Sequence, residues 1–296
     1  MDLDTLIITV FCTLDDAMKS CFAGKRLRQS GPPTILADSE VLTMEAVGAF
    51  LGISQEETLF GFFQNHYAHF FPAVGKVHRT TFTRQAANLW KVKERLWLHL
   101  LEKTPHDERF HIIDSFPLPV CRFARAPRCH RFRGEAAFGH DAVARQTFYG
   151  FRFHALAAWP GVIVRLCLAP GNQQELAVAP QLVEEIEGQL IGDRNYWSPQ
   201  LHQELSVSHL NLLAPYRNKS KDPWPKRSHL LSNLRYRIDT VFGQLIDRFG
   251  IREVGAKDLW HMASRLLRAV LSHTLMVYLN IQQGNEPLQL EKLLAT

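Results

Sequence analysis

The stretch that decides the fold lies near the middle of the chain and reads His111-Ile112-Ile113-Asp114-Ser115-Phe116-Pro117. Its short run of apolar, β-branched residues predicts a buried strand that ends at an acidic residue. Open α/β sheets bind their ligands outside the carboxyl ends of their strands, where a residue in this position emerges. Asp114 is therefore the first candidate for a functional carboxylate.

A second stretch repeats this arrangement and reads Gln189-Leu190-Ile191-Gly192-Asp193. Its apolar residues predict another strand, and an aspartate again follows it. Two strands that each bring a carboxylate to the same sheet edge suggest a site for a divalent cation. Mg²⁺ is a hard ion that prefers carboxylate oxygens and retains several waters, so Asp114 and Asp193 are its predicted ligands.

A third carboxylate is expected on a helix packed across that edge. The segment from His229 to Phe249 predicts a long helix with one apolar stripe, and Asp239 lies beside that stripe. Arg235 is four residues earlier on the same helical face, where it can pair with the carboxylate or reach a nucleic-acid phosphate. A single acid after a strand is more often a turn or cap residue. Three acids in this order favour a catalytic site.

Two clusters of basic residues follow Asp114 and precede Asp239. The first has interleaved aromatic rings and no acid before Glu135, and consists of Arg122, Arg125, Arg128, Arg131 and Arg133. The second consists of Arg217, Lys219, Lys221, Lys226 and Arg227. Such segments can neutralise phosphates and stack on bases at an opened nucleic-acid end. A solvated surface loop is the alternative for either cluster, and the absence of acids favours nucleic acid for the first.

Strand patterns dominate the chain from about residue 109. The predicted elements after the first strand are strands at 151–158 and 162–168, a helix at 175–187, strands at 189–192 and 210–214, and helices at 229–249 and 259–279. Trp159-Pro160-Gly161 predicts a hairpin turn between the first two of these strands. This order is typical of a mixed sheet flanked by helices, which is an α/β fold class.

The chain before this region is helical. Apolar residues recur at three- and four-residue steps up to about residue 104. A helix-turn-helix around Gly52 and a set of helices that only pack together are equally consistent with the pattern. We therefore expect a helical domain at 1–104 for DNA binding or dimerisation, a catalytic domain at 105–255, and a C-terminal helix at 256–296 that packs on the catalytic domain.

Composition restricts the protein class without naming a function. The 296 residues have a formal net charge of +5 and a pI of about 9.0, which permits an anionic partner without requiring one. The five cysteines include no Cys-x-x-Cys pair, which indicates a reducing compartment. A zinc site at Cys121, Cys129, His130 and His140 is disfavoured because the spacing is irregular. No signal peptide or membrane span is predicted, so we expect a cytoplasmic protein.

The ordered motifs resemble those of a known family. The similar segments are Asp114-Ser115-Phe116-Pro117-Leu118-Pro119-Val120-Cys121, Tyr149-Gly150-Phe151-Arg152-Phe153-His154, Gly192-Asp193-Arg194-Asn195-Tyr196, Arg235-x-x-Ile238-Asp239-x-Val241-Phe242 and the amino-terminal run from Leu36 to Thr43. Together they resemble the DDE insertion-sequence transposases, specifically the insertion-sequence nine-eighty-two family, over about residues 34 to 280.

The resemblance implies a ribonuclease-H-like sheet that holds two Mg²⁺ ions, for which Mn²⁺ can substitute, through Asp114, Asp193 and Asp239. It further implies double-stranded DNA as substrate (the element's terminal inverted repeats and the target), a homodimer, and a location at the bacterial nucleoid. The chain departs from the family at its third acid, which is usually Glu and is Asp239 here. The lysine that related families place on the following helix is absent, because Ile246 occupies that region.

Two other functions remain open at the level of sequence. A Mg²⁺-dependent nuclease on the same fold would cut DNA without joining it. A catalytically impaired, transposase-derived DNA-binding protein is suggested by Asp239, whose carboxylate reaches less far than that of Glu. An aspartic protease is disfavoured, because no second Asp-Ser/Thr-Gly motif appears. No covalent nucleophile is required, and Ser115 is interpreted as a structural hydroxyl.

Overall fold

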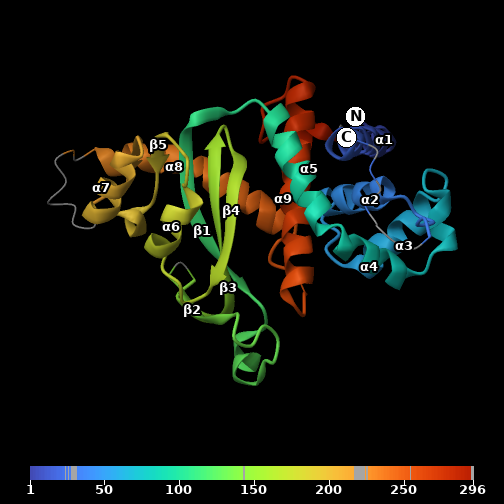
Figure 1. Ribbon diagram of the computed structural model, residues 1–296, viewed down its shortest axis with the longest axis horizontal. Coiled ribbons are helices and arrows are strands. Elements are labelled where there is room, and N and C mark those ends of the chain that lie inside the picture. The colour runs from blue at the N-terminus through green and yellow to red at the C-terminus, as the bar shows by residue number, and fades with distance from the viewer. Residues whose placement is uncertain are drawn as a thin grey trace. The chain divides into compact units, whose positions relative to one another are not determined.

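The computed structural model describes residues 1–23, 25, 27, 32–142, 144–216, 224, 226–253 and 255–294. The chain forms two compact units (Figure 1). A helical unit consists of Met1–Pro105 together with Gly243–Thr296, and a sheet unit consists of His106–Phe242. The helical unit is thus assembled from two segments that are distant in sequence, and the sheet unit is inserted between them.

Helices make up the described part of the first unit. They are α1 (Leu3–Phe22), α2 (Asp38–Phe50), α3 (Glu56–His66), η1 (Pro72–Lys76), α4 (Arg79–Asn88), α5 (Trp90–Lys103), the π-helical turn η5 (Gln244–Arg248), α9 (Leu259–Gln282) and η6 (Leu290–Leu293). The Asp2 side chain caps α1 by accepting a hydrogen bond from the Thr5 N–H at 2.7 Å. Leu6, Val10 and Leu14 are buried on one face of that helix, as the periodicity predicts.

Helix α9 forms the core of the helical unit. Every residue from Leu266 to Val277 is buried, and the helix packs against α5, α2 and α4. The sequence predicts this helix at 259–279, close to its observed bounds, and expects it to pack on the catalytic domain. A helix that is buried on all sides fits a helical bundle as well as a sheet, so the pattern does not identify the partner that the structure gives it.

A buried histidine in α9 makes the stability of this unit depend on pH. The His273 Nε2 atom lies 3.0 Å from Gln244 Oε1, and the ring packs against Phe249. Burial lowers the pKa of His273 from 6.5 to about 4, so the folded state keeps this imidazole neutral while the unfolded chain takes up a proton. Its contribution to stability is therefore present above pH 6.5 and is lost as the pH falls to about 4.

We expect the free energy of unfolding to decrease over this pH window, with His273 contributing about 1.4 kcal/mol per pH unit at most. Urea unfolding at a series of pH values measures the slope. His273→Gln is expected to reduce it, whereas the exposed His69→Gln leaves it unchanged. Equal slopes in the wild type and in His273→Gln would show that this imidazole is not the buried group described here.

The sheet unit contains a six-stranded mixed sheet among its described residues. The strands are β1 (Asp107–Pro119), β2 (Ala137–Asp141), β3 (Gln146–Trp159), β4 (Val162–Pro170), β5 (Gly188–Ile191) and β6 (Leu210–Leu213). Their order is β2-β3-β1-β5-β6, and β4 also pairs with β3. β1, β3 and β4 are antiparallel neighbours, whereas β5 and β6 run parallel to β1. This topology confirms the predicted mixed sheet.

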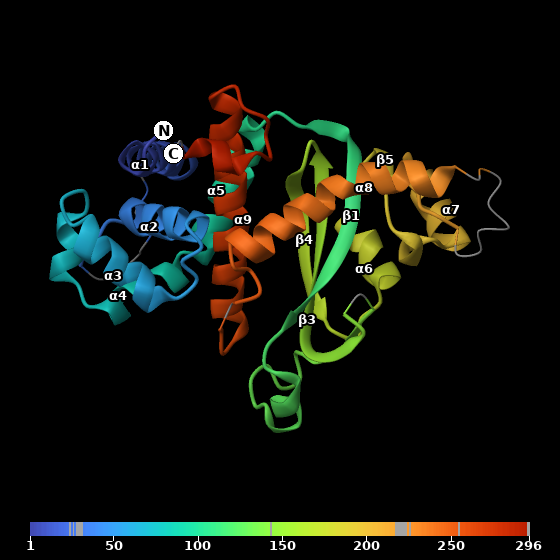
Figure 2. The same cartoon turned by 180° about the vertical axis from the view of Figure 1, so that it is seen from behind.

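Helices lie on both faces of this sheet. They are η2 (Phe123–Arg128), α6 (Glu175–Leu182), η3 (Arg194–Tyr196), α7 (Pro199–Val207) and α8 (Arg227–Gly243). Figure 2 shows α8 crossing over β1, where Phe242 packs edge-on against Phe116 with ring centroids 4.8 Å apart. α6 is shorter than the predicted helix at 175–187, because Glu185 and Gly188 adopt left-handed backbone conformations that turn the chain into β5.

Strand β1 is longer than the sequence predicts, and this corrects the expected position of Asp114. The strand continues beyond Asp114 to Pro119, because β3 pairs with it without a break from His111 opposite Ala158 to Pro119 opposite Gly150, after an irregularity between Asp107 and His111. On its other edge, β1 pairs with β5 only over Phe110–Ile112. Asp114 is therefore inside β1, two residues beyond the point where the parallel pairing of β1 with β5 ends.

Strand β2 was not predicted, whereas the hairpin between β3 and β4 was. Gly139 stands in the middle of β2, and a side chain there would collide with the carbonyl oxygen of Gly171. The close approach of backbone requires glycine, and a glycine interrupts the alternating pattern by which strands are recognised. Trp159-Pro160-Gly161 forms the turn at the predicted place. None of the described helices combines the length and apolar character that crossing a membrane requires.

Candidate active site

The strand register places Asp114 and Asp193 just beyond the end of the same parallel ladder. Ile112 of β1 pairs with Ile191 of β5 in the last step of their parallel ladder. Asp114 and Asp193 each lie two residues further along, Asp114 still within β1 and Asp193 in the turn that follows β5. The charge of Asp193 acts on Asp114, which agrees with this placement. The two carboxylates predicted at one sheet edge thus follow the same parallel ladder and are close enough for their charges to interact.

Asp114 is held by a charged hydrogen bond from α8. The Arg235 Nη2 atom donates to Asp114 Oδ2 at 2.9 Å, and the Ser115 backbone N–H donates to Oδ1 at 2.8 Å. Only 14% of the Asp114 side chain is exposed. Burial raises the pKa of Asp114 to about 6, although Arg235 and the Ser115 N–H act in the opposite direction. Asp114 is thus a carboxylate whose charge depends on a nearby cation.

Asp193 is fixed by the turn that follows β5. Its Oδ1 atom accepts a hydrogen bond from the Asn195 N–H at 2.8 Å, which caps the short helix η3. The last residue of η3, Tyr196, is fully buried beneath Gly192. A Cβ atom on residue 192 would lie 2.9 Å from the Cβ of Tyr196, closer than side chains tolerate. Gly192 therefore allows the turn that orients Asp193.

Substitution of Gly192 tests this dependence. We expect Gly192→Ala to displace Tyr196 or the strand end, because the added methyl group overpacks a filled site, and to cost about 1–3 kcal/mol of stability. The same displacement moves the Asp193 carboxylate. Metal-dependent activity should therefore fall even at temperatures at which the variant is still fully folded. Thermal unfolding and an activity assay measure the two effects. Gly75→Ala is the control, because its added Cβ has no atom within 4 Å among the described residues.

Asp239 lies on the same face of α8 as the residues that contact β1. Arg235, Asp239 and Phe242 are spaced four and three residues apart and so share one face. Arg235 contacts Asp114, and Phe242 contacts Phe116, which places Asp239 between two points where α8 touches β1. Burial lowers the pKa of Arg235, but the charges of Asp114, Asp193 and Asp239 outweigh that effect and raise it. Arg235 thus contacts Asp114, and the charges of Asp193 and Asp239 act on it as well.

The chemistry of these three side chains fits a hard divalent cation. Carboxylate oxygens are the donors that Mg²⁺ and Mn²⁺ prefer, and the buried Asp114 needs a positive partner to remain ionised. Arg235 is the cation that the structure places among them. Within the described residues, no three His, Cys, Asp or Glu side chains are arranged as a ready-made metal site. Cation binding would therefore require Arg235 to share or release Asp114.

A second polar network lies directly behind Asp114, and the sequence did not predict it. Side chains alternate along β1, so Ser115 points to the face opposite Asp114, towards α6. The Ser115 hydroxyl donates to Glu175 Oε1 at 2.6 Å, and Arg152 Nη1 lies 3.4 Å from the same carboxylate oxygen. Arg152 also donates to Ser115 Oγ at 3.2 Å and to the His140 carbonyl oxygen at 2.9 Å. Ser115 and Arg152 together thus link β1, β3 and β2 to α6.

The buried hydroxyl of Tyr196 is affected by the charges of carboxylates on both faces of β1. Burial raises its pKa well above the ordinary value, and the charges of Glu175, Asp114 and Asp193 add to that effect. Glu175 is therefore a fourth carboxylate close to the site. No sequence signal distinguished it, because an acid in the first turn of a helix is an ordinary stabilising residue. Its role depends on Ser115 and Arg152, which lie 60 and 23 residues away in sequence.

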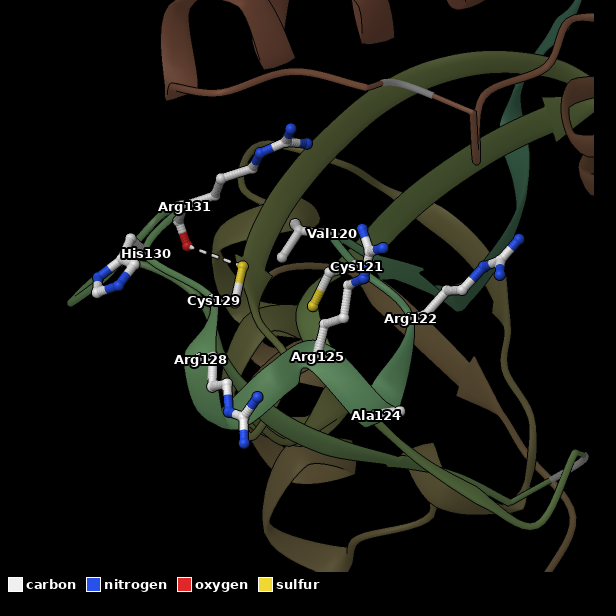
Figure 3. A pocket seen from close by; sticks show the side chains of 9 residues that line it. All are labelled: Val120, Cys121, Arg122, Ala124, Arg125, Arg128, Cys129, His130 and Arg131. Atoms are coloured by element: carbon white, nitrogen blue, oxygen red, sulfur yellow. Dashed lines mark hydrogen bonds between the residues drawn. The ribbon is translucent and has the colours of Figure 1, made fainter.

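The first basic cluster surrounds a hollow on the sheet unit (Figure 3). Arg122, Arg125, Arg128 and Arg131 line it together with His130 and two cysteines, and its volume is about 850 Å³. Arg133, the fifth predicted arginine, is exposed beyond this lining. Cys121 and Cys129 are both free thiols in the structure. Within the described residues, they join no third ligand in a metal group.

The second basic cluster is described only in part. Arg217, Lys219 and Lys221 lie outside the described residues, whereas Lys226 is exposed near the start of α8. The Arg227 guanidinium lies over the ring of Tyr216 at 5.0 Å and over that of Trp224 at 5.8 Å. Tyr216 in turn stacks on Trp197, with ring centroids 3.9 Å apart. The Arg227 guanidinium therefore makes cation–π contacts with two aromatic rings.

Comparison with known proteins adds independent findings. Residues 105–254 match the family model described as "Transposase DDE domain". Among solved structures, the chain is similar to the piggyBac transposase in its synaptic complex with hairpin DNA, with a TM-score of 0.50 and 9% sequence identity. The similarity covers 96% of this chain and 75% of that one. No curated protein matches the chain in sequence. At this identity the structural similarity concerns the fold, and it supports the ribonuclease-H-like sheet preceded by helices.

Proposed function

Since this chain belongs to the transposase DDE domain family, we propose that it cleaves the ends of an insertion sequence and joins them to target DNA. The observation that carries the proposal is that Asp114 and Asp193 each lie two residues beyond the last pair of the parallel β1–β5 ladder, while Arg235 of the helix that carries Asp239 donates to Asp114. Three acids from two strands and a crossing helix can converge on one phosphodiester. These residues are the proposed catalytic set.

Asp114, Asp193 and Asp239 would hold two divalent cations, Mg²⁺ or Mn²⁺ in its place. When bound, such ions supply activation of the attacking oxygen and stabilisation of the leaving oxygen in an in-line displacement. The chain itself orients the ligands: Arg235 and the Ser115 N–H fix the two oxygens of Asp114, and the Asn195 N–H fixes Asp193. Cleavage by water and attack by the freed 3′-hydroxyl are both displacements at phosphorus, so one arrangement serves both steps.

Double-stranded DNA is the proposed partner, as terminal inverted repeats and as target. The structurally similar piggyBac transposase is seen in a synaptic complex with DNA, which supports this class of ligand. The proposed contacts are the two basic clusters, with Arg235 at the scissile phosphate once it releases Asp114. Processing two ends together would use a homodimer. We also propose membership in the insertion-sequence nine-eighty-two family, from the motifs around the three acids, and action at the bacterial nucleoid.

One assay separates the proposed function from its alternatives. A labelled duplex that carries the element's own end is incubated with the protein, a supercoiled target plasmid, and Mg²⁺ or Mn²⁺. A transposase yields metal-dependent cleavage together with labelled plasmid, which records strand transfer. Cleavage without labelled plasmid would identify a nuclease. Specific binding that is indifferent to metal, without either product, would identify a DNA-binding protein that has lost its chemistry.

Asp239→Glu tests whether the shorter third acid limits the reaction. The substitution extends the carboxylate by one methylene, roughly 1.5 Å, which is comparable with the tolerance of a preorganised site. If Asp239 coordinates as well as Glu, both proteins cleave at similar rates. A large gain in Asp239→Glu over an inactive wild type would favour the impaired alternative. Asp247→Glu, in the turn after α8, is the matched control.

A further inference from the structure

The hollow bounded by the first basic cluster concentrates positive charge to an unusual degree. Four arginines line it, and no acidic residue occurs between Ser115 and Gly134 in the sequence. Its volume of about 850 Å³ lies in the range of sites that take ligands of nucleotide size. Guanidinium groups bind phosphate through two parallel hydrogen bonds. The hollow is therefore suited to phosphates, whether these belong to a duplex or to a single strand.

The segment that forms the hollow is anchored at both ends. The Val120 N–H donates to the Tyr149 carbonyl oxygen at 3.0 Å, and the Tyr149 hydroxyl donates to the Phe132 carbonyl oxygen at 3.4 Å. The ring of Phe132 is buried against Phe151, with centroids 5.3 Å apart. An anchored loop loses little conformational entropy on binding. The arginines are thus presented on a formed surface.

Exposed aromatic rings adjoin the arginines. Phe123, which lies between Arg122 and Ala124 of the lining, is 54% exposed, and Phe138 of β2 is 49% exposed. The two rings meet edge to face with centroids 6.4 Å apart, and Phe138 rests on Tyr149 at 5.1 Å. Exposed phenyl rings beside guanidinium groups are the combination on which unpaired bases stack. In an intact duplex, the base faces are covered by neighbouring bases and cannot reach such rings.

We propose that residues 120–134, together with Phe138, bind unpaired nucleotides at an opened DNA end. The arginines of the hollow contact the phosphates, and Phe123 and Phe138 stack against the bases. This inference rests on the proposed function, from which it takes DNA as the nucleic acid. It adds the form of the substrate: a DNA end whose terminal base pairs are open, in preference to a continuous duplex.

The test measures binding in the absence of chemistry. Asp114→Asn protein in EDTA is titrated against fluorescent probes: a blunt duplex, the same duplex with a six-nucleotide overhang, and the single strand alone. Stacking contributes about 1–3 kcal/mol per base, so the overhang probe should bind at least about tenfold more tightly than the blunt duplex. Phe123→Ala and Phe138→Ala should remove most of this preference without changing binding to the blunt duplex.

Matched variants keep the test independent of folding. Phe123→Trp should preserve the preference, because indole also stacks, and Arg165→Ala, an exposed arginine of β4, should change nothing. Arg125→Ala and Arg128→Ala should each weaken binding and reduce the slope of log affinity against log salt by about one. Equal affinity for blunt and overhang probes would overturn the proposal, as would Phe123→Ala and Phe138→Ala variants that weaken both equally.

The outcome is separable from that of the proposed function. An overhang preference that depends on Phe123 in a protein that neither cuts nor joins DNA would preserve this inference and reject the transposase. Cutting and joining of DNA without any overhang preference would support the transposase and reject the inference about unpaired nucleotides. An RNA strand of the same sequence that outcompetes the DNA strand would assign the surface to RNA and would overturn the proposed DNA end.

Discussion

Asp114→Asn is expected to lower metal-dependent DNA cleavage by on the order of 10³-fold or more, while binding of DNA stays within about twofold. The amide keeps the shape of the carboxylate, and its one oxygen can accept the hydrogen bond of either Arg235 or the Ser115 N–H, so one of these two bonds is lost together with the negative charge that a cation requires. The pairing of β1 with β3 and β5 does not involve this side chain and is expected to persist. Single-turnover cleavage and anisotropy binding of one labelled duplex measure both quantities.

Glu108→Gln is the matched control for this variant. Glu108 is an exposed acid on the same strand, so its amide removes the same charge from β1 without touching the site. We expect wild-type cleavage from it. Near wild-type cleavage by Asp114→Asn would remove Asp114 from the catalytic set, and with it the argument from the strand register. A loss of folding, seen by circular dichroism, would instead point to Asp114 and Arg235 as a structural ion pair.

The second large effect is expected on stability, from a lysine in the helical unit. Lys93 of α5 is completely buried, and its ammonium lies 2.8 and 2.7 Å from the two oxygens of Glu45 in α2. It also donates to Ser264 Oγ of α9 at 2.9 Å and to the Ala86 carbonyl oxygen at 3.0 Å. Burial lowers the pKa of Lys93, and Glu45 opposes this effect. This ion pair joins helices that are far apart in sequence.

Lys93→Ala is expected to cost about 3–5 kcal/mol of folding free energy, because it leaves Glu45 buried without its cation. The double variant Lys93→Met, Glu45→Leu should recover most of that loss, since the apolar pair needs no desolvation of charge. Urea unfolding measures both, with the exposed Lys91→Ala as control. A cost below about 1 kcal/mol for Lys93→Ala would show that water or another group compensates Glu45, contrary to the packing described here.

The sequence predicts those features that arise from local patterns. The β3–β4 hairpin follows from Trp159-Pro160-Gly161, and the long apolar run of α9 predicts its helix within a few residues. The place of Asp193 after an apolar strand also follows, whereas Asp114, which is expected at the end of its strand, lies inside β1. These predictions require only the period of side chains along a strand or helix.

Features that depend on contacts between distant residues were not predictable. Ser115 gives no sign of its bond to Glu175, and the length of β1 beyond Asp114 depends on pairing with β3, which no residue of β1 specifies. Arg235 was expected to pair with Asp239, four residues further along its helix, or with a phosphate. That its partner is Asp114, 121 residues away, depends on how α8 crosses the sheet. Local propensity contains no information about that crossing.

The inserted position of the sheet unit sets an order of events during biosynthesis. α1 to α5 leave the ribosome first, but α9, whose buried residues fill the core between them, is translated only after all six described strands. Until then, the apolar faces of α2 and α5 have no partner from α9, and Lys93 has no Ser264. The nascent helical segment therefore keeps this apolar surface exposed until the rest of the chain has been translated. The sheet unit is contiguous in sequence and can fold in the meantime.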